Sequence, residues 1–75
     1  MIMIQKISKR ELQILQLVAY EYSSKDIARE LHISIHTAIS HRKKLMEKLD
    51  VKNSAGLVRI GFEVGLLKIP MSKVA

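Results

Sequence analysis

The chain has 75 residues, of which 48% are apolar and 4% aromatic, with no Cys and a formal net charge of +6. This length leaves room for one small domain, and the missing Cys excludes disulfides and thiolate metal sites. The charge indicates a polyanionic partner, either nucleic acid or an anionic membrane, although so few aromatic side chains argue against a stacking platform for single strands.

The first residues, MIMIQKI, are too few and too polar for a signal-peptide core or a membrane span. We therefore expect a cytoplasmic protein. An N-terminal arm over 1–6 should precede one ordered domain over 7–67, and a flexible tail over 68–75 should contain the only Pro of the chain.

Two capping motifs mark the first two helices. The sequence SKRE at 8–11 has a Ser at the cap position and a Glu three residues later, which predicts a helix over about 9–20. The sequence SSKD at 23–26 repeats this arrangement with an Asp and predicts a short helix over about 24–31.

Ser34 is the predicted cap of a third helix over about 35–49, after a short turn through His32 and Ile33. A short helix, a tight turn and a longer helix describe a helix-turn-helix, whose second helix reads DNA. At 100° per residue, the core side of this helix holds Ile35, Ala38, Arg42, Leu45, Met46 and Leu49. The opposite side holds His36, Ser40, Lys43, Lys44 and Glu47, bordered by Thr37 and Ile39.

The outer side of this helix has the chemistry of a major-groove reader. Lys can bind guanine acceptors, Ser can pair with either base edge, and an exposed Ile can contact a thymine methyl group. Residues 42–52 include five basic and two acidic side chains, a local excess of +3. Charge alone is equally consistent with an ordinary solvated helix face.

The chain resembles the LuxR-type DNA-binding domain, also called the FixJ, NarL or GerE type, over about 7–67. The resemblance is carried by Arg10-Glu11, Ser23, Lys25-Asp26-Ile27-Ala28, Leu31, Ile33-Ser34, Thr37, His41, Lys48-Leu49, Val51 and Gly65-Leu66-Leu67. It implies a compact all-α domain of four helices, a third helix in the major groove of double-stranded DNA, and a role in transcription with RNA polymerase as a further partner. Position by position it implies base contacts by Ile39, Ser40, Lys43, His36 and Lys44, and phosphate contacts by Lys25, Thr37, Lys48 and Ser34.

A fourth helix should begin after a cap at Asn53 or Ser54 and continue to about Val64. Its apolar and small residues predict a weak homodimer on DNA through Leu57, Val58 and Gly61. The apolar residues of this helix could instead close the core of the domain itself, an interpretation that stays open here for Leu57 and Ile60.

Four positions depart from the family pattern. Glu21 replaces a frequent glycine after the first helix, so a positive φ there would be held by a residue that resists it. Asp50 replaces another frequent glycine, although Asp tolerates a left-handed conformation better than most residues. Ala38 replaces a usual Val, and Ser54 replaces a frequent Arg. Arg42 is an unusual residue on the core side, and we expect its stem to pack while its head reaches an acid or a phosphate.

Other classes of function are less consistent with the sequence. His32 and His36 are four residues apart, but the cap at Ser34 separates them, and no Ser, His and acid set suggests a nucleophile. We therefore expect no catalytic residue, metal or cofactor, and a structural role for His41. A helix that lies on a membrane surface usually carries a Trp or Phe anchor, and the third helix has neither. A protein-interaction adaptor that kept the helix-turn-helix without binding DNA is the alternative that remains.

Overall fold

The computed structural model describes residues 6–68. The regular secondary structure in that range is helical, without a β-strand. The helices are α1 (Lys9–Ala19), α2 (Ser24–Leu31), α3 (Ile35–Leu49) and α4 (Ser54–Glu63). This confirms the predicted all-α fold of four helices, with boundaries within a residue of those expected. Apart from Lys6 and Lys68, the predicted arm and tail lie outside the described residues.

Side-chain caps begin the helices as the sequence predicts. The Ser8 hydroxyl accepts from the Glu11 N–H at 3.0 Å, while the Glu11 carboxylate accepts from the Ser8 N–H at 2.9 Å. Ser23 and Asp26 form the same reciprocal pair at 3.1 and 3.0 Å. Asn53 caps α4 by accepting from the Gly56 N–H at 2.9 Å. Each cap satisfies amide donors that the first helical turn leaves unpaired.

Within residues 6–68, three residues other than Gly adopt a positive φ, one at the end of each of the first three helices. Glu21 has φ 69°, His32 has φ 56° and Asp50 has φ 55°. His32 and Asp50 are the left-handed C-caps of α2 and α3. The left-handed His32 directs the chain from α2 into α3 within three residues, 32–34, which completes the helix-turn-helix.

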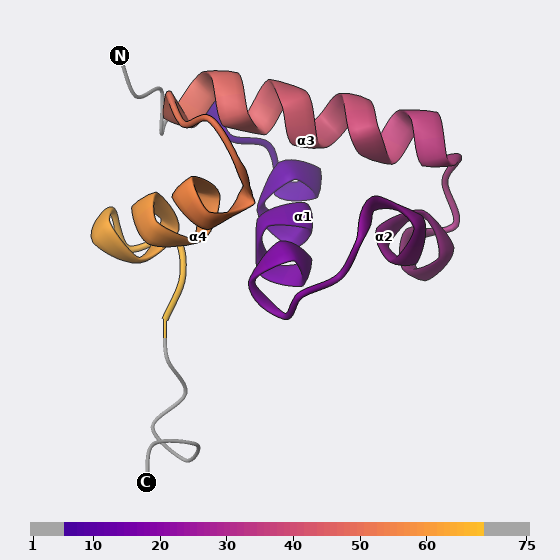
Figure 1. The fold of residues 1–75 in the computed structure, drawn as a ribbon, viewed down its shortest axis with the longest axis horizontal. Helices are drawn as coiled ribbons and strands as arrows, with labels where there is room; N and C mark the ends of the chain where they lie inside the picture. The colour runs from indigo at the N-terminus through magenta and orange to yellow at the C-terminus, as the bar shows by residue number, and fades with distance from the viewer. Residues whose placement is uncertain (1–5, 69–75) are drawn as a thin grey trace, which may run out of the picture.

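The core forms where α1, α2 and α4 meet one side of α3. In Figure 1, α3 lies across the molecule, with α1 under its middle, α2 under its N-terminal end and α4 under its C-terminal end. The buried apolar residues are Ile14, Leu15, Val18, Ile27, Ala28, Ala38, Leu45, Leu49, Leu57, Ile60 and Leu67. Because the other helices all pack on one side, the opposite side of α3 stays uncovered.

Ile35 was assigned to the core side of α3, and this prediction is wrong. Its side chain is 42% exposed, whereas Ala38 one turn later is fully buried. Ile35 is the first residue of α3, at the end of the helix that extends past α1 and away from α4 (Figure 1). The helical angle therefore points in the right direction, but at this end of α3 the packing against α2 leaves the Ile35 side chain partly exposed (Figure 1).

The structure also corrects two of the three residues predicted for the dimer interface. Leu57 is fully buried in the core of its own chain. Gly61 is buried too, and a Cβ placed there would lie 2.7 Å from Cδ1 of Leu67. The missing side chain of Gly61 thus admits Leu67 of the same chain rather than a second helix. Val58 is half-buried and packs against the core.

Candidate nucleic-acid interface

All the residues predicted to contact bases lie on the uncovered surface of α3. Ile39 is 49% exposed. The remaining predicted readers, each exposed, are His36, Ser40, Lys43 and Lys44. Neither ammonium group of Lys43 and Lys44 pairs with another side chain within 6–68. We call this set, with Ile39, the reading face.

The N-terminal turn of α3 is held by two hydroxyl groups. The Ser34 hydroxyl accepts from the Thr37 N–H at 3.0 Å and shares a hydrogen bond with the Thr37 hydroxyl at 2.8 Å. Both residues are exposed and lie beside the reading face. These two residues, expected at phosphates, therefore fix the start of α3 and remain accessible to solvent.

Lys25 lies in the first turn of α2, where its exposed ammonium is next to the capping box of that helix. Hydrogen bonds from the backbone N–H and then the hydroxyl of Ser23 lower the pKa of the Asp26 carboxyl. The carboxylate therefore stays ionised and serves the helix N-terminus, where a negative charge is favourable.

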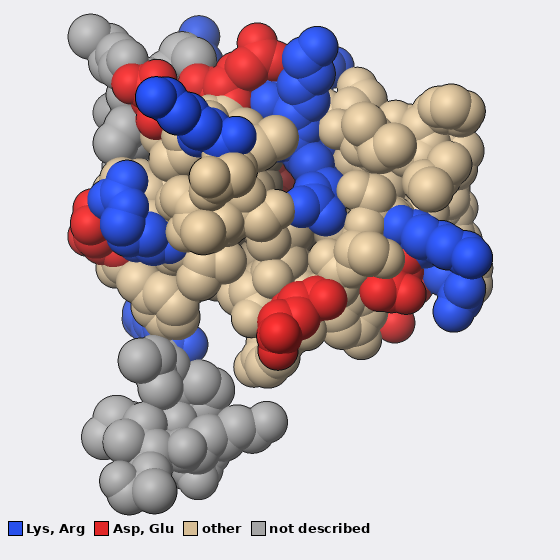
Figure 2. Space-filling view, in the orientation of Figure 1, with Lys and Arg blue, Asp and Glu red and all other residues tan. Residues whose placement is uncertain are grey.

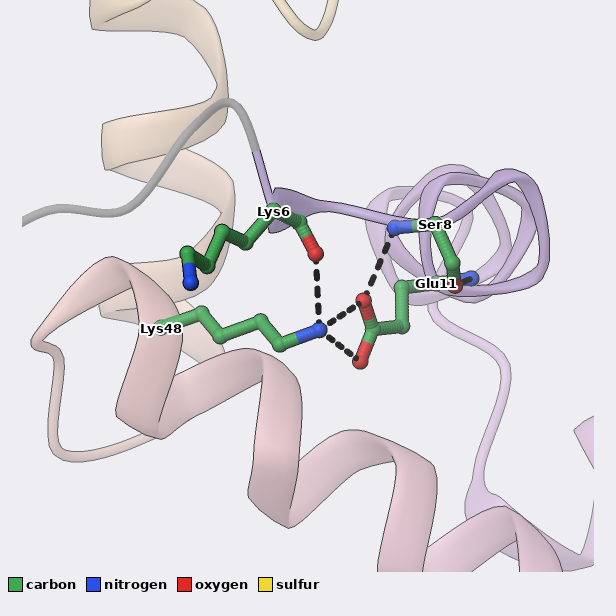
Figure 3. A network of polar contacts seen from close by, with 4 residues as sticks. All are labelled: Lys6, Ser8, Glu11 and Lys48. Carbon is green, nitrogen blue, oxygen red and sulfur yellow. Dashed lines mark hydrogen bonds and ion pairs between the residues drawn. The ribbon is translucent and has the colours of Figure 1, made fainter.

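Lys48, for which the resemblance implies a phosphate contact, has partners within the domain itself (Figure 3). Its Nζ lies 2.7 and 3.0 Å from the two carboxylate oxygens of Glu11 and 2.8 Å from the backbone oxygen of Lys6. Three hydrogen bonds occupy all three N–H donors of the ammonium group. This network joins the C-terminal end of α3 to the start of α1.

Glu11 is 3% exposed and is the one buried charged residue among those described. Its burial would raise the pKa of the carboxyl, but hydrogen bonds from Lys48 and Ser8, together with the Lys48 charge, lower it below the ordinary 4.5. The Glu11 carboxylate thus completes the capping box at the start of α1 and also forms the ion pair with Lys48. The capping role was readable from sequence. The ion pair, between residues 37 positions apart, had no sequence signal.

Arg42 connects α3 to two neighbouring helices through side-chain hydrogen bonds. One guanidinium nitrogen donates to the Ser24 hydroxyl at 3.3 Å, and the other donates to the Ser54 hydroxyl. These serines are the first residues of α2 and α4. The predicted acid is not the partner of Arg42 within the described residues, where its head spans two helix N-termini through neutral hydroxyls, and a phosphate contact stays a prediction.

The basic side chains do not form one uniform patch. In the view of Figure 2, Lys and Arg groups lie at the top over α3, at the right over α2 and at the left over α4, with acidic groups between them. Arg59 and Glu63 on α4 form an exposed ion pair at 2.8 Å. On a mixed surface of this kind, the positions of the unpaired cations matter more for DNA binding than the total charge does.

Residues 6–68 contain neither a metal cluster nor a membrane-spanning helix. No group of three or more His, Asp or Glu side chains there could hold a metal ion. None of the helices in that range is long and apolar enough to cross a bilayer.

Comparison with known proteins identifies the domain. Residues 5–60 match the family described as bacterial regulatory proteins of the luxR family. The chain belongs to this family. A solved structure of the transcription factor GerE is similar, with a TM-score of 0.76 and 33% identity, over 81% of this chain and 91% of that chain. The chain is therefore a DNA-binding transcriptional regulator or the output domain of one.

Several longer regulators share this domain. The oxygen regulatory protein NreC of Staphylococcus haemolyticus is 44% identical over 61 residues, 81% of this chain. The NreC protein of Staphylococcus epidermidis is 42% identical over 62 residues, 83% of this chain. The chain spans about 28% of the length of these curated relatives.

Proposed function

We propose that residues 7–67 bind double-stranded DNA sequence-specifically, with α3 in the major groove. The observation that carries this proposal is the reading face, a continuous exposed surface of polar, cationic and aliphatic groups on the second helix of a helix-turn-helix. The domain limits are supported by Ile7, which packs against the core, and by Leu67, which is part of it.

The proposed contacts fall into two groups. Ile39, Ser40 and Lys43 form the centre of the reading face and contact base edges, and His36 and Lys44 extend that contact along the groove. Lys25, Ser34 and Thr37 lie at the N-terminal turns of α2 and α3, where exposed donors suit phosphate oxygens and fix the register of α3 on the duplex.

The proposed partners of the whole regulator are a second copy and RNA polymerase. With Leu57 and Gly61 buried, a weak dimer on DNA would use Val58 and the exposed residues beside it on α4. Contact with RNA polymerase follows from the family's role in transcription, and no described residue is assigned to it.

The proposal is tested by measuring affinity for random-sequence duplex DNA at a series of salt concentrations. Lys and Arg contacts to phosphates release counterions, so log K should fall linearly as log salt rises. Absence of binding, or binding that does not depend on salt, would favour the adaptor alternative. Selection of tight sites from a random duplex pool then supplies the preferred sequence and the half-site spacing of any dimer.

The variant Lys43→Ala distinguishes base recognition from electrostatic attraction to the phosphates. As a base reader, Lys43 should contribute about 1 to 3 kcal/mol on the selected site, and its loss should relax the preference at one or two base pairs. A uniform loss over all sequences would instead make Lys43 a phosphate contact. Lys52→Ala is the matched control, because Lys52 is exposed but lies beyond α3.

A further inference from the structure

Two isoleucines make an aliphatic strip along the N-terminal half of α3. Ile35 is 42% exposed and Ile39 is 49% exposed, and the other exposed large hydrophobics of the described chain, Tyr20 and Phe62, lie outside α3. Residues four apart on a helix are neighbours on its surface. The strip therefore interrupts an exposed helix surface whose other residues are polar or charged.

The surroundings of the strip indicate what covers it. Lys43 follows Ile39 by one further helical turn, so the aliphatic strip leads directly into the centre of the reading face. Ser34 and Thr37, with hydroxyl groups at the surface, flank its N-terminal end. An apolar protein partner would have to bury these polar and cationic neighbours, whereas a DNA major groove offers phosphates and base acceptors beside its own apolar groups.

The apolar group that the major groove presents is the 5-methyl of thymine. Four residues of α-helix rise about 6 Å, and successive bases of one strand rise about 3.4 Å. The two side chains therefore span one to two base steps. This matches two thymines that are adjacent or separated by one base.

We propose that Ile35 and Ile39 together read thymine methyl groups, so that the preferred site carries two closely spaced thymines beside the position read by Lys43. This inference rests on the proposed function, because it requires α3 to lie in the major groove. It adds Ile35 to the reading surface and names the chemical group that the strip recognises.

The experiment replaces thymine by deoxyuridine, which removes only the methyl group and keeps every base-pair hydrogen bond. The probe is the duplex obtained by selection, with each thymine replaced in turn. Burying one methyl-sized group contributes about fourfold in affinity, so deoxyuridine at either contacted position should weaken binding about fourfold. Replacement at uncontacted thymines should leave the affinity unchanged.

Ile35→Ala and Ile39→Ala assign each methyl to its side chain. Each variant should lose the discrimination between thymine and deoxyuridine at one position and keep it at the other. Ile35→Val should retain the discrimination, because it keeps a branched aliphatic group. Lys43→Ala is the matched control, since it should weaken binding while both methyl effects persist. Circular dichroism checks that every variant is folded.

The outcomes are distinguishable. Binding that depends on salt and sequence but is indifferent to deoxyuridine would overturn the methyl-reading inference and leave the proposed function intact. A methyl effect that persists in Ile35→Ala at both positions would remove Ile35 from the reading surface and overturn the inference as stated. Absence of binding to any duplex would overturn the proposed function and the inference with it.

Discussion

Lys43 and Lys48 lie on the same helix, five residues apart, and the structure gives them opposite surroundings. Lys43 is exposed on the reading face, without an ion pair to any residue within 6–68. Lys48 points to the other side, where Glu11 and the backbone of Lys6 take all its donors. Counting basic residues on α3 therefore overstates the charge available to DNA.

The difference between the two lysines follows from their angular positions. A position on the uncovered side of α3 leaves the ammonium in water, whereas Lys48 meets the first turn of α1, where Glu11 is nearly buried. A buried carboxylate is destabilising without a partner of opposite charge. Glu11 therefore holds Lys48 in an ion pair that stabilises the fold. One lysine thus contributes to recognition and the other to stability.

The largest expected effect is the loss of stability in Lys48→Ala. This change leaves the Glu11 carboxylate buried without its cation, which costs about 3 to 5 kcal/mol for a fully buried pair. Because the Lys48 side chain is 26% exposed, we expect about 2 to 3 kcal/mol here. Urea unfolding measures it. Lys44→Ala, on an exposed side chain, is the control and should change stability little.

Arg42→Leu should have the next largest effect. It removes the two hydrogen bonds that connect α3 to the N-termini of α2 and α4, at about 1 to 2 kcal/mol in the free energy of unfolding. Ser24→Ala and Ser54→Ala should each cost less. Arg42→Lys should not restore the stability, because a single ammonium cannot reproduce the guanidinium fork that reaches both hydroxyls. Full rescue by Lys would show that only the charge matters.

The Glu11 network should also make stability depend on pH. The pKa of Glu11 is lower in the folded chain than its ordinary 4.5, so folding favours the ionised form. Its stabilisation is complete above that ordinary value and is lost as the pH falls through the folded pKa. Unfolding curves over this acidic range should therefore differ from those of Glu11→Gln, whose stability should be lower at neutral pH and should converge toward the original in acid. Parallel pH profiles would contradict this.

The smallest expected effect is a gain of stability in Glu21→Gly. Glu21 has φ 69°, a left-handed conformation that costs other residues about 1 to 2 kcal/mol and Gly very little. After the entropic cost of Gly, about 0.5 to 1 kcal/mol, the net gain should be about 0.5 kcal/mol. Thermal unfolding measures it. Tyr20→Gly is the control and should destabilise, because Tyr20 has φ −93°. DNA affinity should be unchanged in both.

Local signals explain how much of the fold was predictable from sequence. Helices begin where a side chain accepts a hydrogen bond from the backbone N–H three residues later, as at Ser23 and Asn53. The helix boundaries therefore followed from short-range hydrogen bonds. The angular pattern of α3 likewise predicted the exposed reading residues. The positive φ at Glu21 was foreseen only as a consequence of the glycine usual at that position.

Predictions that depended on which helix covers which turn were less successful. Ile35 has the helical angle of a core residue but stays 42% exposed at the first turn of α3, and Gly61 faces Leu67 because the chain folds back after α4. The pairing of Lys48 with Glu11 and the bridge from Arg42 likewise join residues far apart in sequence. Such contacts depend on tertiary geometry that periodicity does not contain.

The central claim, that the two lysines divide recognition from stability, is tested most directly by one crossed measurement. Lys43→Ala and Lys48→Ala are each assayed for urea unfolding and, under conditions where both are folded, for affinity to the selected duplex. We expect Lys43→Ala to lose affinity with unchanged unfolding, and Lys48→Ala to lose stability with unchanged affinity. A folded Lys48→Ala protein that loses as much affinity as Lys43→Ala would contradict it.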